Sequence, residues 1–245
     1  TDFLQKFYSA FRQIIFFLVP ASALCFLLRA HLVRIVFGAG KFDWSATKLT
    51  AACFGIFMFA LLAQGLIYLA SRAFFAIKNT VIPTVVSIIS IAVLPALAKL
   101  FIFLLSYPNG FSLFFQQFLK IEGMKNLVVI ALPLAISVDA IIQIALLLIL
   151  LKLKIKELKY KELFVFFVKV FAASMITLAI TYFVRQAFGG FLGSETFIVL
   201  FVQTAITGSL GFAIYFALAY IMKLPEISAL KYLLNRVSGT ATSKK

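Results

Sequence analysis

Six long runs of apolar residues constrain this chain more than any other feature of its sequence. They cover residues 13–28, 49–71, 79–106, 126–151, 163–184 and 196–222. About 20 apolar residues are needed to cross the ~30 Å hydrocarbon layer of a bilayer, and the short first run reaches toward Val36 if Arg29 snorkels to the interface. Within hydrocarbon each backbone N–H and C=O must be bonded inside the segment, which requires a helix. The sequence therefore predicts an all-α, polytopic transmembrane bundle with six spanning helices.

The composition excludes an ordinary soluble domain. Of the 245 residues, 64% are hydrophobic, and the mean hydropathy is +1.11. A net charge of +15 is typical of nucleic-acid binding, but here the basic residues flank apolar runs instead of lining one face of a soluble domain. We therefore expect membrane lipids as partners and no nucleic acid.

The sequence contains no pattern typical of an enzyme. Cys25 and Cys53 sit inside apolar runs, where cysteine acts as a small hydrophobic side chain. The only histidine, His31, has no Cys or His spacing around it that would hold a metal. No Ser/His/Asp set and no Gly-rich phosphate loop is present. We expect no catalysis, no cofactor and no metal.

The basic residues also predict the orientation of the chain. With six spans, the two termini and the second and fourth connections share one side, which carries 14 lysines and arginines against 7 on the other. The positive-inside rule makes the richer side cytoplasmic. The lysine run at residues 152–161 is a topology signal, or it binds anionic lipid head groups.

Two connections on the other side have helix signals of their own. Asp43 or Ser45 can cap the second span. Pro108-Asn109-Gly110 forms a turn, and four phenylalanines follow at helical spacing, namely Phe111, Phe114, Phe115 and Phe118. That spacing predicts a helix in the membrane interface, whose aromatic face meets lipid or a partner protein.

Two segments resemble the MurJ/MviN family. Residues 32–47 read LVRIVFGAGKFDWSAT, similar to a family segment with an apolar face, then Phe, Gly-(Lys/Ala)-Phe and a Ser/Thr helix start. Residues 70–83 read ASRAFFAIKNTVIP, similar to a family signature on a cytoplasmic loop: Phe-Tyr-Ala, two residues, Asp-Thr, two residues and Pro. Here Asn79-Thr80 stands for Asp-Thr and Pro83 matches, while Val19-Pro20 resembles the family's Leu-Pro.

The resemblance implies a flippase of the bacterial inner membrane that translocates lipid II, a peptidoglycan precursor linked to undecaprenyl diphosphate. The family fold has two pseudo-symmetric lobes plus a C-terminal helix pair, and this chain covers the part from the ninth helix onward. The partner would then be the N-terminal lobe of the same protein. The chain begins Thr-Asp-Phe, without an initiator Met, so we expect a piece of a longer protein.

This resemblance divides the chain into four parts. Residues 1–153 are the C-terminal-lobe helices, 154–162 a basic cytoplasmic loop, 163–223 the C-terminal helix pair and 224–245 a cytoplasmic tail. Two alternatives stay open. One is a related exporter of undecaprenyl-linked oligosaccharides or drugs, and the other is a membrane scaffold or channel subunit that transports nothing.

Five residues are candidates for functional roles. Arg72 ends an uncharged span beside the signature loop, where an arginine can hold the phosphate of an entering head group. Lys99 and Asp139 lie inside spans and can form a buried pair that is either static or part of a gating or cation-linked switch. Gly208 and Gly211 allow close approach of a helix or a lipid tail.

Overall fold

The computed structural model describes residues 2–38, 43–124, 127–155, 160–191 and 197–227. These residues form helices α1 to α7 and one short 3₁₀ helix, η1, with no strand among them. Their bounds are α1 Asp2–Phe37, α2 Trp44–Ala76, α3 Val81–Ser106, α4 Gly110–Leu119, η1 Leu127–Ile130, α5 Ala131–Lys154, α6 Tyr160–Phe191 and α7 Phe197–Ile221. The predicted loop at 154–162 lies partly, and the predicted tail at 224–245 mostly, outside the described residues.

Six of the described helices are long and apolar enough to cross a membrane, so the prediction of an all-α chain with six spans is confirmed. The chain is a multi-pass membrane protein. The first span begins earlier than the charge pattern suggested, at Phe3. The amphipathic residues before the first apolar run continue the same helix because Phe7 and Phe11 are buried in the core.

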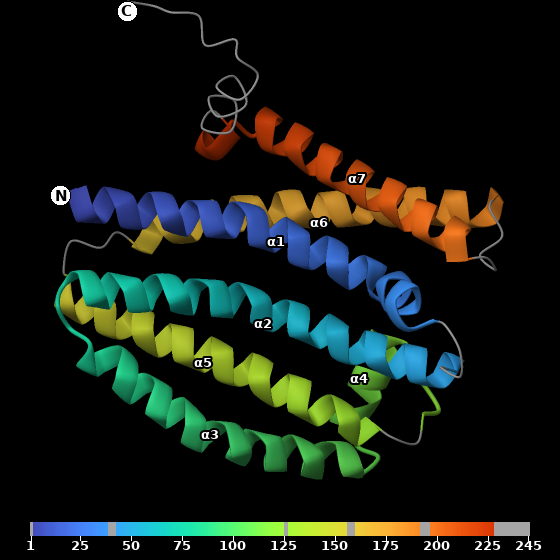
Figure 1. Cartoon of the computed structure of the whole chain (residues 1–245), viewed down its shortest axis with the longest axis horizontal. Coiled ribbons are helices and arrows are strands. Elements are labelled where there is room, and N and C mark those ends of the chain that lie inside the picture. Colours follow the sequence, from blue (N-terminus) through green and yellow to red (C-terminus); the bar gives the residue numbers. More distant parts are fainter. Residues whose placement is uncertain (1, 39–42, 125–126, 156–159, 192–196, 228–245) are drawn as a thin grey trace, which may run out of the picture.

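The spanning helices pack in an order different from their order in the sequence (Figure 1). Helix α2 packs against α1 on one side and α5 on the other, and α3 lies on the outside of α5. Helices α6 and α7 pack against α1 and against each other. We call the end of the bundle that holds the start of α1, the α2–α3 turn and the end of α7 the basic end.

The central helix α2 owes its position to small residues. Its buried positions are mostly alanine, with Gly55 among them. Apolar side chains gain little by leaving lipid for protein, so close backbone approach by small residues is a main source of helix association in membranes. A Cβ on Gly55 would lie 2.8 Å from Cδ of Arg29 and 3.2 Å from the Phe26 ring, so this glycine makes room for α1.

Arg29 has a different role from the predicted interfacial anchor. Its guanidinium donates to the backbone O of Phe26 at 3.1 Å and to the backbone O of Leu119 at 3.2 Å. It also lies over the Phe26 ring, 4.3 Å from the centroid. Arg29 is therefore half-buried between α1 and the C-terminal end of α4, where free carbonyls favour a cation.

The predicted aromatic helix exists as α4, and Asn109 caps it by accepting from the Ser112 N–H at 2.8 Å. Part of its aromatic face packs on other helices, and part is exposed. Phe111 stacks on Phe101 of α3 at 6.0 Å between ring centroids, while Phe114 is exposed. The helix is thus anchored to α3 and α1 instead of lying free in the interface.

Candidate functional site

The turn between α2 and α3, which carries the resembling signature, is closed by backbone and side-chain hydrogen bonds. The N–H of Asn79 donates to O of Phe74 at 3.0 Å, and the N–H of Lys78 donates to O of Phe75 at 2.9 Å. This is a Schellman arrangement, in which Lys78 takes the left-handed position with φ 56°. Oδ1 of Asn79 accepts from the N–H of Ile82 at 3.2 Å, so it satisfies a free donor in the first turn of α3.

Two other signature positions have packing roles. Phe74 is fully buried, and Pro83 is buried in the first turn of α3. A proline fits there because the N–H groups of a first helical turn have no partner within the helix. The signature residues therefore fix the turn between α2 and α3 at the basic end, and α3 leaves this turn to pack on the outside of α5.

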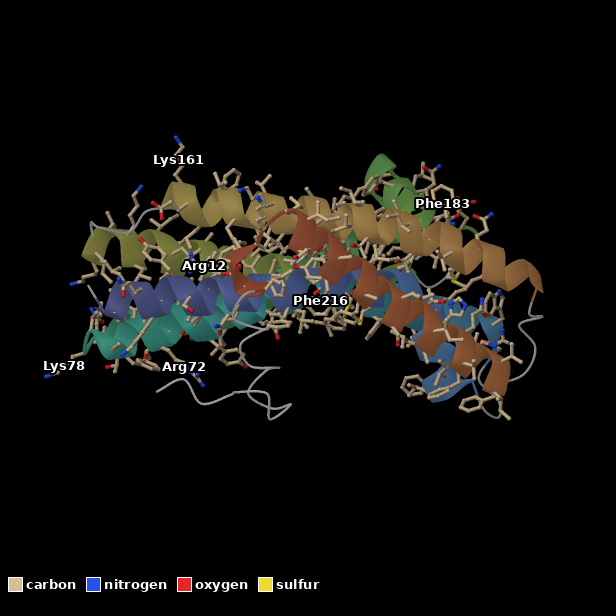
Figure 2. The ribbon with its side chains drawn as sticks, turned by 90° about the horizontal axis from the view of Figure 1, so that it is seen from above. Arg12, Arg72, Lys78, Lys161, Phe183 and Phe216 are labelled. Carbon is tan, nitrogen blue, oxygen red and sulfur yellow. The ribbon has the colours of Figure 1, made fainter. Side chains whose placement is uncertain are left out.

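Arg72 lies near the end of α2, shortly before this turn, and is exposed. It lines a shallow cavity of about 160 Å³ between α1 and α2, together with Lys6. The floor of the cavity is apolar, with Phe3, Phe7 and Leu69. Figure 2 shows Arg72 and Lys78 on one side of the bundle, at the basic end and away from Lys161. Two cations over an apolar floor can bind a phosphate that is attached to a lipid.

Asp139 is buried between α5 and α3, but its partner is Ser90 and not the predicted Lys99. Oγ of Ser90 donates to Oδ2 of Asp139 at 2.5 Å. Lys99 lies nine residues farther along α3, about 13 Å by the rise of a helix, and it is exposed. The antiparallel register of α3 and α5 brings the middle of α3 to Asp139, which is why the pair does not form.

A second polar contact lies beside the first. Nε2 of Gln143 donates to Oγ of Ser87 at 3.4 Å. The two bonds form a polar ladder between α3 and α5 that sequence reasoning missed. The sequence contains a pattern that indicates these contacts. Ser87 and Ser90 are three residues apart, and Asp139 and Gln143 are four residues apart, so each pair lies on one face of its helix.

Gly208 and Gly211 lie at the contact between α7 and α1. A Cβ on Gly211 would lie 2.5 Å from Cδ2 of Leu24 and 3.2 Å from Oγ1 of Thr181. A Cβ on Gly208 would lie 3.7 Å from Cδ1 of Leu28, an ordinary contact. This geometry favours helix packing over lipid-tail approach, at Gly211 above all.

The described residues offer no metal site, because no group of three or more His, Cys, Asp or Glu side chains is placed to hold an ion there. The candidate site consists of two parts, the arginine cavity at the basic end and the polar ladder between α3 and α5.

Comparison with known proteins matches this chain to a protein family and to solved structures. Residues 1–202 match the family described as "Lipid II flippase MurJ". Among solved structures, the chain is similar to "Lipid II flippase MurJ, inward closed conformation", with a TM-score of 0.66 and 20% identity. The match covers 92% of this chain and 40% of that one, so the chain spans well under half of the solved protein. None of the curated proteins compared gives a significant match.

Proposed function

This chain belongs to the MurJ lipid II flippase family, and we propose that it forms the C-terminal part of a flippase that moves lipid II across the bacterial inner membrane. The family match over residues 1–202 carries the proposal. The six-span fold supports it, because a charged and sugar-bearing head group needs a protein path through the membrane. Even one charge at the bilayer centre costs about 3 kcal/mol on insertion scales.

The chain is proposed to act as a transporter and not as an enzyme. Alternating access requires two helical units that move against each other around a central site. This chain supplies one unit together with α6 and α7, and the N-terminal lobe of the same protein supplies the other. Head group and diphosphate pass between the two units while the lipid tail stays in the bilayer.

Arg72 is proposed to contact the substrate phosphate at the entrance. Its support is the cavity shared with Lys6 and the apolar floor, which suits a phosphate joined to a hydrocarbon chain. Arg72 has a planar guanidinium that can hold phosphate through two parallel hydrogen bonds, a fixed geometry that a lysine ammonium does not offer. Within the described residues, no ion pair neutralises the charge of Arg72.

The polar ladder is proposed to take part in gating. Helix α3 packs mainly on α5 and has little contact with α2, and few of its residues are buried. The bonds of Asp139 and Gln143 to the two serines are therefore a main polar tie of α3 to the bundle. Breaking these two bonds would let α3 shift while the core between α2 and α5 stays packed, and forming them again would return α3 to α5.

We further propose that the basic end, and so both termini, faces the cytoplasm. Accessibility labelling of the full-length protein tests this with two exposed turn residues, Lys78 and Glu122, at opposite ends of the bundle. An impermeant thiol reagent added outside should label Glu122→Cys and not Lys78→Cys. Labelling in the reverse pattern contradicts the orientation.

Complementation tests the function itself. The full-length gene should restore growth when the resident lipid II flippase is depleted, and a gene truncated to this chain should not. A full-length protein that is expressed in the membrane and fails to restore growth contradicts the lipid II assignment.

A further inference from the structure

A second, larger cavity lies at the basic end, on the side of the bundle away from Arg72. It has a volume of about 400 Å³ and lies between Arg12 of α1, the first turns of α6 and the residues just after α7. Figure 2 shows Lys161, at its rim, and Arg72 on opposite sides of the bundle, with Arg12 between them. The two cavities are therefore separate sites.

Four basic side chains from three parts of the chain line this cavity. Lys161 and Lys169 come from α6, Lys223 follows α7, and Arg12 comes from α1. Nε of Arg12 lies 2.9 Å from Oε1 of Glu226, which fixes the guanidinium. The three lysines are exposed, and their side-chain ammonium groups form no ion pair or hydrogen bond with another described residue. With Glu162 also on the wall, the cavity keeps a net positive charge.

An apolar cavity adjoins the basic one at Lys161. It has a volume of about 430 Å³ and lies between α1, α5 and α6. Its wall is built from Phe11, Leu148, Phe164 and Phe167, and the Lys161 side chain is common to both cavities. Cations therefore stand directly beside a hydrocarbon surface at the level where a spanning helix leaves the membrane.

We propose that this pair of cavities binds an anionic phospholipid of the bilayer. The phosphate lies among Lys161, Lys169 and Lys223, and an acyl chain lies against the phenylalanine wall. Lysines on flexible stems bind a phosphate as point charges and can adapt to its position. Basic clusters near the ends of spanning helices attract anionic lipids in the same way. A zwitterionic phospholipid lacks the net charge that the three unpaired lysines require.

Binding to the purified full-length protein in detergent tests the proposal, with phosphatidylglycerol and phosphatidylcholine as probes. The wild type should bind phosphatidylglycerol more tightly. Replacing the three lysines together, Lys161→Gln, Lys169→Gln and Lys223→Gln, should weaken this binding at least tenfold and leave phosphatidylcholine unchanged. Lys78→Gln is the matched control, since it removes an exposed charge at the same end without touching the cavity. Equal binding by the triple variant and the control overturns the proposal.

A second variant separates charge from folding. Val165 is exposed on the wall of the basic cavity, and Val165→Trp fills the cavity while keeping all four cations. It should weaken phosphatidylglycerol binding as well. Unchanged binding in this variant overturns the placement of the phosphate.

The diphosphate of the transported lipid has the same chemistry, so the triple variant is also used to distinguish the two sources. It should bind undecaprenyl diphosphate as the wild type does, because the contact proposed for that diphosphate is Arg72, in the separate cavity. If the triple variant loses binding of undecaprenyl diphosphate as well, the cavity belongs to the transport path and the proposal is overturned. Because the experiment measures lipid binding and not transport, a failure of this proposal can be distinguished from a failure of the proposed flippase function.

Discussion

Oγ of Ser90 on α3 donates a 2.5 Å hydrogen bond to Oδ2 of Asp139 on α5, in the middle of two spanning helices. The contact matters because Asp139 is buried and a buried carboxylate without a partner is strongly destabilising. It also gives α3 a polar tie to the bundle at the point where its surface is otherwise largely exposed.

The first prediction concerns this tie. Ser90→Ala should destabilise the full-length protein because it leaves the Asp139 carboxylate without its donor. In a cycle with Asp139→Ala, the coupling should be about 0.6 kcal/mol or more, the usual size of such bonds between membrane helices. Thermal unfolding in detergent measures it. Lys99→Met is the control partner, and a larger coupling of Asp139 with Lys99 than with Ser90 would contradict the contact.

The second prediction concerns Arg72. Arg72→Lys keeps the positive charge but loses the two-point hold on phosphate, so flipping should fall about tenfold, the effect of losing one hydrogen bond to a charged group of about 1.5 kcal/mol. Reconstituted full-length protein with fluorescent lipid II measures the rate. Arg34→Lys, at the opposite end of the bundle, should have no effect. Full activity of Arg72→Lys would mean that Arg72 only anchors the helix.

The third prediction follows from Glu226, which lies just after α7. Burial raises the pKa of this carboxyl above its ordinary value, and the nearby Arg12 only partly lowers it. A raised pKa means that Glu226 binds its proton more tightly in the folded state than in the unfolded state. The stabilising contribution is therefore complete below the unfolded pKa and is lost as pH rises through the folded pKa.

The melting temperature of the protein in detergent should accordingly fall as pH rises from the ordinary Glu pKa upward. Glu226→Gln should flatten this part of the profile, while Arg12→Gln should steepen it by removing the cation. A profile that is identical in Glu226→Gln and the wild type would show that another group controls it.

The local features of the fold were predictable from the sequence, because they depend on neighbours along the chain. The six spans follow from apolar runs, the cap at Asp43 follows from residue type, and the turn before α4 follows from Pro108-Asn109-Gly110. Oδ1 of Asp43 accepts from the N–H of Ala46 at 2.7 Å, and this bond lowers the pKa of its carboxyl. Such contacts need no knowledge of how helices pack.

The partners of charged side chains were not predictable, because they depend on the register between distant helices. Lys99 and Asp139 sit on consecutive spans, and only the relative shift of α3 and α5 places Ser90 at the carboxylate. Arg29 reaches Leu119 for the same reason, and Arg12 reaches Glu226 from the far end of the chain. Hydropathy carries no information about these shifts.

The last prediction separates helix packing from lipid contact at the two glycines of α7. Gly208→Ala should be tolerated or slightly stabilising, because the new Cβ meets only an ordinary 3.7 Å contact and alanine favours a helix over glycine by about 1 kcal/mol. Gly211→Ala should destabilise by about 1–3 kcal/mol, the usual cost of overpacking, because its Cβ falls 2.5 Å from the buried Leu24. Thermal unfolding in detergent measures both. Adding Leu24→Ala to Gly211→Ala should recover part of the loss, since it removes the clashing atoms. If the two glycine variants behave alike and Leu24→Ala rescues neither, α7 does not pack on α1 through Gly211, and contact with a lipid tail becomes the better explanation of both glycines.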